Sequence, residues 1–451
     1  MSNAGVAAQT LEEALAQTYQ SNPVLEAQRA ALRQVDENVF QANSGYLPNL
    51  SGTGSIDRTQ TDFTVESVTT PEGTTDGGDE LSFPATNTAL SASVNQPIFR
   101  GFRTKNSVKR AKADVLAGRA NLATVEQDVL LQTVTTYVNV LRDQAVLKLN
   151  DNLIAVLRRQ LEASQDRFRV GEITRTDVAQ SQARLADAVS RRAAAAADLT
   201  ASQEQYRRVV GDLPVNLVEP KTPDLPIDVT AATQTAFERA PIILAARYNE
   251  EAAQSSVKEA KGGLLPSVNG FARISRNTGV QVLGPAITAD NTRVVSTVGA
   301  EVTVPFFQSG AEYSAVRQAK QLRSQRILEI RAAERQVVEQ VTTAWEVYQA
   351  SLAQIKANEE SVNANNIALE GVRQEAAVGS RTTLDVLDAE QEALDAQVNL
   401  VRAKRDQTVA AYSLLASMGQ LTARQLDLAV KIYDPEEHAD KVDWKFFGFG
   451  D

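Results

Sequence analysis

The sequence contains no cysteine and only one histidine, His438. These absences exclude disulfides, thiolate nucleophiles, Cys/His metal sites and histidine-based catalytic triads from the body of the chain. Aromatic residues are only 5% of the 451 residues, which is little for a thick globular core. The sequence also lacks a nucleotide-binding loop, since Gly52-Thr-Gly54 alone is no phosphate site. We therefore expect neither an enzyme nor a cofactor.

Positive charge is in deficit, because the formal net charge is −10 and the pI is near 5.0. This balance disfavours nucleic acid as a partner, since phosphate binding needs clustered Lys and Arg. No run approaches 18 apolar residues, so we expect no transmembrane helix. Residues 1–9 lack the apolar core of a signal peptide, and we expect them to be an expression-tag scar or the remnant of a removed leader.

The chain contains a duplication with fixed spacings. Asn22-Pro23 recurs as Ala240-Pro241 with an offset of 218, whereas Val170-Gly171 recurs as Val378-Gly379 with an offset of 208. One longer insertion in the first copy explains the change, and residues 65–86 have the composition of a loop. We predict repeat 1 at residues 10–211, a proline-rich linker at 212–227, repeat 2 at 228–419 and a C-terminal equatorial or tail segment at 420–451.

Long helices are the main element predicted for each copy. Thr10 and Glu13 form a capping-box pattern, and Pro23 suits the first turn of a second helix. From Gly101 to Val170 there is no proline, so about 70 residues of helix would span about 105 Å. Apolar residues spaced seven apart indicate that these helices pack as coiled coils, at Leu147, Ile154, Leu161 and Phe168. Glycine then reverses the chain at 171 and again at 379, which predicts two helical hairpins.

Strands are predicted between the helices, as hairpins at about 49–96 and 267–304. In the first, Leu90, Ala92 and Val94 alternate with polar residues. This pattern fits either tilted membrane strands or a hairpin in water with one wet face. Four strands leave two open edges and cannot close a barrel alone, so we expect oligomerisation.

Several motifs together resemble the TolC family of outer-membrane factors. They are Thr10-Leu-Glu-Glu-Ala-Leu15 with Asn22-Pro23, Ser44-Gly-Tyr-Leu-Pro48, Gln96-Pro-Ile-Phe99, Arg169-Val-Gly-Glu-Ile-Thr-Arg-Thr-Asp177, and Val378-Gly-Ser-Arg-Thr-Thr-Leu-Asp-Val-Leu-Asp388. The match runs through about residues 10–430 in both copies. The tail from Tyr433 to His438 resembles the alphaproteobacterial branch.

The resemblance implies a mainly α fold with a β-barrel part. Three chains would form a trimeric α-barrel of helical hairpins and a shared 12-stranded antiparallel transmembrane β-barrel. Such homotrimers sit in the bacterial outer membrane, contact its lipid and extend through the periplasm. They conduct drugs or secreted proteins passively from a tripartite efflux or type I secretion complex. Their partners are a periplasmic adaptor (membrane fusion protein) and an inner-membrane pump of the ABC or RND type.

The resemblance also assigns the two hairpin tips to adaptor docking. The first tip carries Val170, Gly171, Thr174 and Asp177, and the second carries Val378, Gly379 and Thr382. The alternative to docking is that the two glycines only make positive-φ turns that cap a helix.

A gate is implied at the second tip. Asp385 and Asp388 lie three apart and match the family positions that form aspartate rings, which could hold a cation. Arg381 resembles the family's gating arginine, although Ala376 stands where a well-known member has an aromatic residue. The alternative for the carboxylates is ordinary stabilisation of a helix start.

Two further readings stay open. The chain could be a soluble or periplasmic coiled-coil adaptor or scaffold, although adaptors usually have one helical hairpin rather than two. Four phenylalanines just past the strand ends could form an interfacial aromatic belt or pack at the strand-to-helix corner: Phe99, Phe102, Phe306 and Phe307.

Overall fold

The structure is a computed structural model that describes residues 8–64, 67–70, 73–76, 80–284 and 287–442. Residues 1–7 of the predicted scar or leader remnant and residues 443–451 of the predicted tail segment therefore lie outside the described residues. The elements are, in chain order, α1 (Leu11–Ser21), α2 (Pro23–Asn43), a 3₁₀ turn (Ser44–Tyr46), β1 (Asn49–Thr64), β2 (Ser67–Thr70), β3 (Gly73–Asp76), β4 (Glu80–Arg100), α3 (Arg103–Arg169), α4 (Arg175–Val210), α5 (Val229–Arg239), α6 (Pro241–Gly262), β5 (Ser267–Gly284), β6 (Ile287–Thr303), α7 (Ala311–Ala377), α8 (Thr383–Ser417) and α9 (Glu437–Val442).

These elements pack into two compact units, and each unit takes segments from both halves of the sequence. The helical unit contains the described residues of 8–35, 114–249 and 326–441. The sheet unit contains the described residues of 36–113 and 250–325, with Val442. Both long helices, α3 and α7, begin in the sheet unit and continue into the helical unit.

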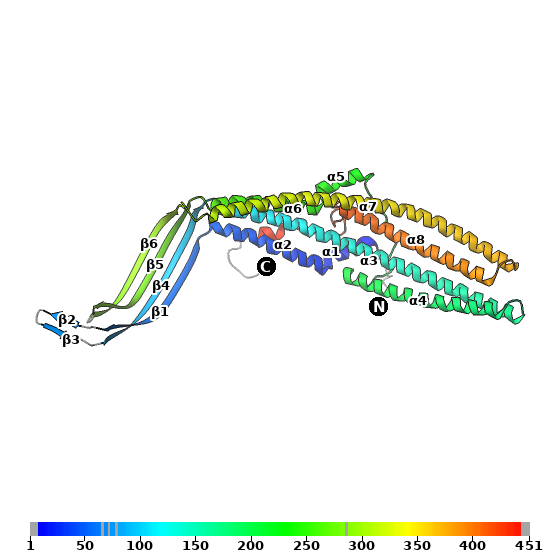
Figure 1. Cartoon of the computed structure of the whole chain (residues 1–451), viewed down its shortest axis with the longest axis horizontal. Coiled ribbons are helices and arrows are strands. Elements are labelled where there is room, and N and C mark those ends of the chain that lie inside the picture. The colour runs from blue at the N-terminus through cyan, green and yellow to red at the C-terminus, as the bar shows by residue number, and fades with distance from the viewer. Residues whose placement is uncertain (1–7, 65–66, 71–72, 77–79, 285–286, 443–451) are drawn as a thin grey trace. The chain divides into compact units, whose positions relative to one another are not determined.

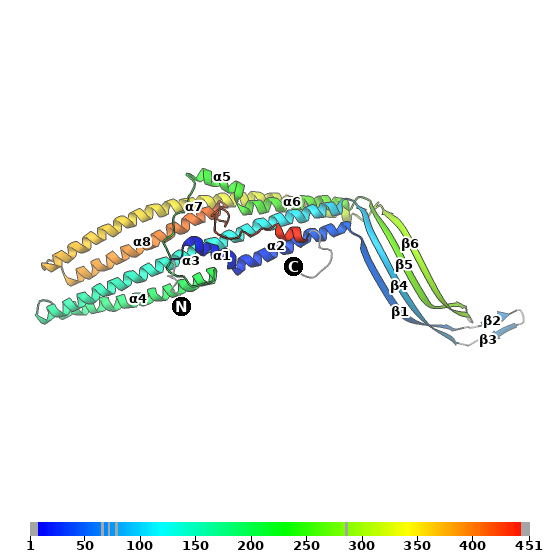
Figure 2. The ribbon, with the colours of Figure 1, turned by 180° about the vertical axis from the view of Figure 1, so that it is seen from behind.

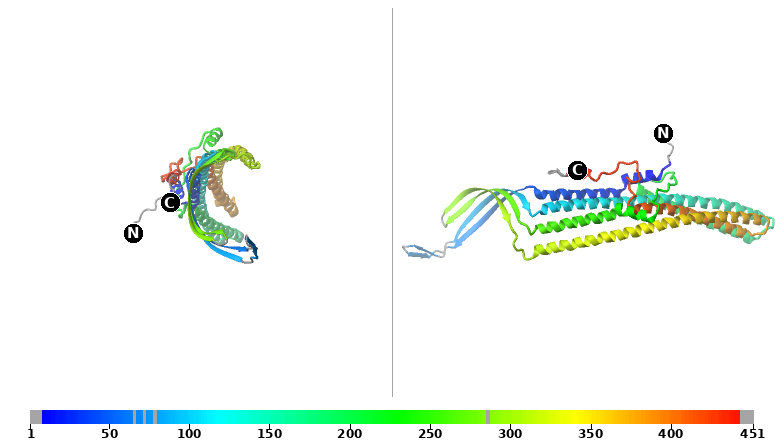
Figure 3. Two further views of the ribbon diagram at one scale, coloured as in Figure 1. Left: turned by 90° about the vertical axis from the view of Figure 1, so that its left-hand side faces the viewer. Right: turned by 90° about the horizontal axis from the view of Figure 1, so that it is seen from above.

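The sheet unit is built on one antiparallel sheet with strand order β1-β4-β5-β6 (Figure 1). Its two hairpins meet where β4 pairs with β5, and the strands bow along their length (Figure 3). The loop predicted at 65–86 is wrong for the described residues, because β2 pairs with β3 there and β4 begins at Glu80 and pairs through Pro84. Pro84 fits in the ladder opposite Gln60 because β4 pairs with β5 only from Thr88 onward.

The two faces of this sheet differ as the alternation predicts. The register aligns Leu50, Val94, Ala272 and Val298 across the four strands, so all four side chains share one face. Val298 is 83% exposed on this apolar face. The opposite face is polar, where hydroxyls bond across the strands at Ser51–Ser93 (2.9 Å) and Thr53–Ser91 (2.7 Å).

Helix ends follow the signals in the sequence. Thr10 and Glu13 form the predicted capping box of α1, with the Glu13 carboxylate accepting from the Thr10 N–H at 3.0 Å. The prolines at positions 23 and 241 begin α2 and α6. The helices α3 and α7 each run for 67 residues, which confirms the long helix predicted in each copy. Within the described residues, no helix is both long and apolar enough to span a bilayer.

The main core lies in the helical unit, where α1 packs on α3 and the ends of α4 and α8. Its largest fully buried side chains include Tyr137, which orders two distant backbone segments. The Tyr137 hydroxyl lies 2.8 Å from Gln9 O and 2.7 Å from Val218 O, and it accepts from the Val218 N–H at 3.0 Å. The proline-rich segment after α4 is thereby held against the start of α1.

Beyond this core, α3 packs antiparallel to α4, and α7 packs antiparallel to α8 (Figure 2). In the first pair the buried hydroxyls of Ser164 and Ser181 lie 3.2 Å apart. In the second pair the Arg373 Nε donates to the buried Glu390 carboxylate at 3.1 Å. Each pair therefore closes with its own polar bond just before its tip.

Candidate gate and docking site at the helical tips

The first tip turn, residues 170–174, joins α3 to α4. Gly171 has a φ of 81°, and its N–H donates to Phe168 O at 3.0 Å while the Glu172 N–H donates to Arg167 O at 2.9 Å. Thr174 then caps α4, because its hydroxyl oxygen accepts from the Asp177 N–H at 3.4 Å. In return, the Asp177 carboxylate accepts from the Thr174 N–H and hydroxyl, each at 2.8 Å. The Val170 side chain is left 77% exposed.

The second tip turn, residues 378–382, repeats this geometry between α7 and α8. Gly379 has a φ of 80°, and the Asp385 carboxylate accepts from the Thr382 N–H at 2.9 Å and from its hydroxyl at 2.8 Å. Val378 is 82% exposed. Both tips thus present an exposed valine on a tightly hydrogen-bonded turn.

The two capping carboxylates are held ionised by these bonds. The Thr174 hydroxyl and N–H lower the pKa of Asp177 below its ordinary value. The Thr382 N–H, with its hydroxyl, lowers the pKa of Asp385 in the same way. Both groups therefore carry a negative charge at neutral pH, because hydrogen bonds donated to a carboxylate stabilise its ionised form.

Arg381 belongs to the second tip and pairs within its own hairpin. Its Nε donates to the Glu375 carboxylate at 2.8 Å, and this bond raises the pKa of Arg381. Both side chains are about half exposed, so the pair is solvated and weak. Arg381 can therefore exchange Glu375 for another acidic partner with only a small change in free energy.

Asp388 forms an ion pair with an arginine of the other hairpin. The Arg184 guanidinium on α4 forms an ion pair with the Asp388 carboxylate on α8. One heptad further, Arg191 on α4 lies 3.9 Å from the Asp395 carboxylate on α8. These two contacts form an α4–α8 charge ladder, which joins the two hairpins near their tips.

An apolar cluster supports this ladder. Ala188 of α4 packs with Leu387 and Leu394 of α8, and three α3 side chains complete the cluster at Leu153, Ile154 and Leu157. Arg184 and Arg191 were not singled out in the sequence. Their spacing of seven, matched by the spacing of seven between Asp388 and Asp395, is the signal that could have found them.

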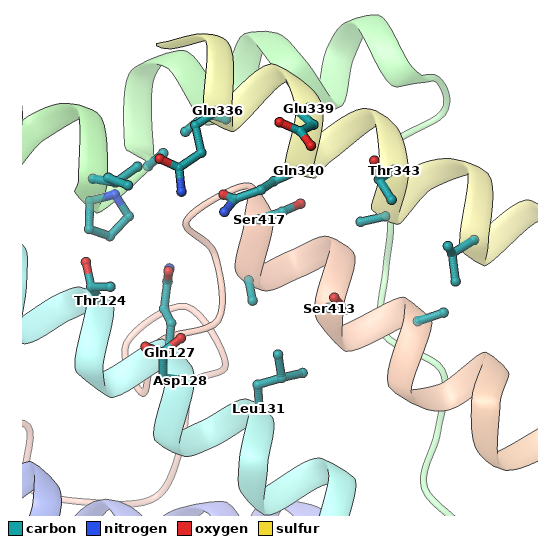
Figure 4. Close-up of a pocket in the computed structure, with 18 residues that line it drawn as sticks. Thr124, Gln127, Asp128, Leu131, Gln336, Glu339, Gln340, Thr343, Ser413 and Ser417 are labelled. Carbon is teal, nitrogen blue, oxygen red and sulfur yellow. The ribbon is translucent and has the colours of Figure 1, made fainter. Parts of the chain in front are cut away.

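A separate cavity of about 620 Å³ lies in the helical unit, between α3, the start of α6, α7 and α8 (Figure 4). Its lining includes Gln127 and Asp128 of α3 facing Gln336 and Gln340 of α7. Burial raises the pKa of Asp128. None of the predicted gate or docking residues lines this cavity.

Known proteins match nearly the whole chain. The family model described as outer membrane efflux protein matches twice, at residues 14–212 and 232–420. The efflux protein BepC of Brucella suis is 35% identical over 441 residues, which are 98% of this chain and 92% of BepC. TolC of Escherichia coli is 27% identical and aligns with 94% of this chain and 86% of its own length. Among solved structures, the CmeC outer-membrane channel of Campylobacter jejuni has a TM-score of 0.75 at 16% identity, covering 96% of this chain and 89% of CmeC.

The chain belongs to the outer membrane efflux protein family. It is an outer-membrane exit duct for efflux or secretion, with the predicted mainly α fold in two tandem repeats. The family is one of transport channels rather than enzymes. This assignment decides against the alternative of a coiled-coil adaptor or scaffold, and the relationship to a Brucella protein is consistent with the alphaproteobacterial branch.

Proposed function

We propose that three copies of this chain form a passive duct that is gated at its periplasmic tip and docks an adaptor there. Four strands per chain give a trimer twelve strands, and two helical hairpins per chain give it twelve long helical segments in the tunnel wall. The observation that supports the gate is the α4–α8 charge ladder together with the Arg381–Glu375 pair. All of these ion pairs are solvent-exposed and therefore easily rearranged.

In this proposal Asp385 and Asp388 face the axis of the trimer and form the constriction. Six carboxylates crowded around a narrow hole favour a bound cation, because the cation offsets their mutual repulsion. The residues in the gate are the Asp385 and Asp388 carboxylates, and Arg381 restrains the tip of its hairpin. The pump partner is an ABC or RND transporter of the inner membrane.

Single-channel conductance in planar bilayers tests the gate. We expect Asp385→Ala with Asp388→Ala to raise the conductance and to abolish block by divalent cations. The matched control is Glu359→Ala with Glu360→Ala, which removes two exposed carboxylates of α7. An unchanged conductance and unchanged block in the gate variant would remove the gate assignment.

Adaptor docking is proposed for Val170 and Val378, with Gly171, Gly379, Thr174, Thr382 and Asp177 shaping the turns. Burying the two exposed valines in the interface would raise the affinity for the adaptor several-fold to tens-of-fold, at roughly 25 cal/mol per Å² of apolar area. Val170→Asp with Val378→Asp should therefore weaken capture of the cognate adaptor at least about tenfold in a pull-down with the intact trimer. Val24→Asp is the control, because this exposed valine lies on α2. Equal capture by wild type and tip variant would refute docking at the tips.

A further inference from the structure

The sheet unit carries a strongly basic stripe just past its apolar face. Residues 99–112 contain six cationic side chains and no carboxylate, although the whole chain has a net charge of −10. Lys105, Lys109 and Lys112 are spaced four and three apart on α3, so they lie on one face of the helix. All three are exposed, and none has an ion-pair partner within the described part of the chain.

The stripe begins at the apolar face of the sheet. A register shift after Pro97 pairs Phe99 with Val268, and Val268 pairs with Val302, which is 62% exposed on the apolar face. The rings of Phe99 and Phe102 then meet edge to face, with centroids 5.1 Å apart. Phe102 lies in the turn just before α3, has a φ of 60° and is 55% exposed, so it stands between the end of β4 and the lysine face of α3.

A small cavity sits at this corner, lined by both phenylalanines with Tyr46, Arg100 and Lys105. The order of chemistry along the surface is therefore aliphatic, aromatic and cationic. That order matches the hydrocarbon, the interface and the head-group region of a bilayer.

The second repeat keeps a cation at two of the three lysine positions. Shifting the three lysine positions by 208 gives Tyr313, Arg317 and Lys320, which are all exposed at the start of α7. Within the described residues, Arg317 and Lys320 also lack an ion-pair partner.

We propose that these side chains form a collar that binds anionic phospholipid head groups at the periplasmic surface of the outer membrane. The collar consists of Lys105, Lys109, Lys112, Arg317 and Lys320, with the corner phenylalanines seated at the acyl boundary. The proposal rests on the outer-membrane location of the chain. An acidic protein is a poorer occupant of the collar than a lipid head group. The rest of the chain is negatively charged and would repel such a protein around the collar.

Lipid binding by the purified full-length trimer in a nonionic detergent tests the collar. The probes are phosphatidylglycerol and phosphatidylcholine with the same fluorescent acyl chain, and binding is followed by anisotropy. Each basic residue near an anionic head-group layer contributes roughly a fivefold gain in affinity. We expect tighter binding of phosphatidylglycerol, weakened tenfold or more in Lys105→Gln with Lys109→Gln and Lys112→Gln, and weakened by added salt.

Two further variants make the result specific. Arg317→Gln with Lys320→Gln should weaken binding independently, and this pair serves if the triple variant fails to form trimers. Lys221→Gln with Lys356→Gln and Lys404→Gln is the matched control, because it removes three exposed lysines of the helical unit and should bind as wild type does.

Equal affinity for the two lipids, or an unchanged affinity in both collar variants, would overturn the proposal. Displacement of the lipid by millimolar inorganic phosphate would assign the collar to free phosphate instead and would also overturn it. Planar-bilayer conductance should stay at the wild-type value in the collar variants. Absence of channel conductance in the wild-type protein would contradict the proposed duct. Equal binding of the two lipids by a conducting wild-type protein would contradict only the collar.

Discussion

Asp385 is both the carboxylate partner of Thr382 in the capping box of α8 and one of the two proposed gate carboxylates. Because hydrogen bonds from Thr382 lower its pKa, the stabilisation of the cap is fully present above the ordinary aspartate pKa of about 3.9 and is lost as pH falls through the lowered folded value. We predict that the Thr382 amide stays protected from hydrogen exchange, after correction for intrinsic rate, from pH 7 down to about pH 4. Below about pH 4 we expect the Thr382 amide to lose protection as Asp385 takes up a proton, and Asp385→Asn should abolish this loss. Deprotection of the wild type between pH 7 and pH 5 would contradict the capping bond.

Tyr137 is the residue whose hydroxyl is most connected in the core of the helical unit. Tyr137→Phe removes the bonds that the hydroxyl makes to the partly buried backbone groups of Gln9 and Val218. We predict a loss of about 0.5–1.5 kcal/mol in the free energy of unfolding, seen as a lower thermal midpoint of the trimer in detergent. Tyr313→Phe is the control, because Tyr313 is 62% exposed. Equal midpoints for the two variants would show that the hydroxyl of Tyr137 contributes nothing.

Single residues differ in how far the sequence reveals them. The capping pair Thr10–Glu13 was predictable because the two residues are three apart and their bond is local. The bonds of Tyr137 were not, since Gln9 is 128 residues away and Val218 is 81 residues away. The roles of Asp385, Asp388 and Arg381 stay predictions, because a constriction is formed only where several copies meet.

Among the elements, α4 and α8 are joined by the charge ladder, and a charge reversal tests whether it restrains the tip. Arg184→Asp places a carboxylate beside Asp388, so the two helices repel and the channel should conduct more. Arg184→Lys keeps a positive charge beside Asp388, leaves the gate carboxylate in place and should conduct as the wild type does. The interaction energy expected for an exposed pair is about 0.2–1 kcal/mol, a few-fold change in the open fraction. Equal conductance of the Arg184→Asp and Arg184→Lys variants would show that the pair does not restrain the tip.

Element boundaries were predictable where proline and glycine set them. Pro23 begins α2 and Gly379 reverses the chain after α7, because the fixed φ of proline and the positive φ of glycine act locally. The start of β4 at Glu80 was missed. Strand pairing there depends on the partner β1, and the same composition with Pro84 reads as a loop when no partner is known.

At the scale of the molecule, the duplication explains why the chain cannot finish its own sheet. Each repeat supplies one hairpin, and the two hairpins pair through β4 and β5, which leaves β1 and β6 as unpaired edges. Only further copies can cover these edges in the same register. The oligomer was therefore predictable from the strand count, whereas its number of subunits came from family resemblance alone.

The net charge of the chain makes a prediction about the ions that the duct conducts. Three chains carry 3 × (−10) = −30 formal charges, and the proposed constriction concentrates six of the carboxylates where the passage is narrowest. We predict that the reversal potential under a KCl gradient shows cation selectivity, and that the selectivity declines at molar salt, where charges are screened within about 3 Å. Asp385→Asn with Asp388→Asn should reduce it more than Glu359→Gln with Glu360→Gln, although both changes remove two charges per chain. Equal reductions would mean that selectivity follows total charge, and an anion-selective wild type would place the carboxylates away from the path of the ions.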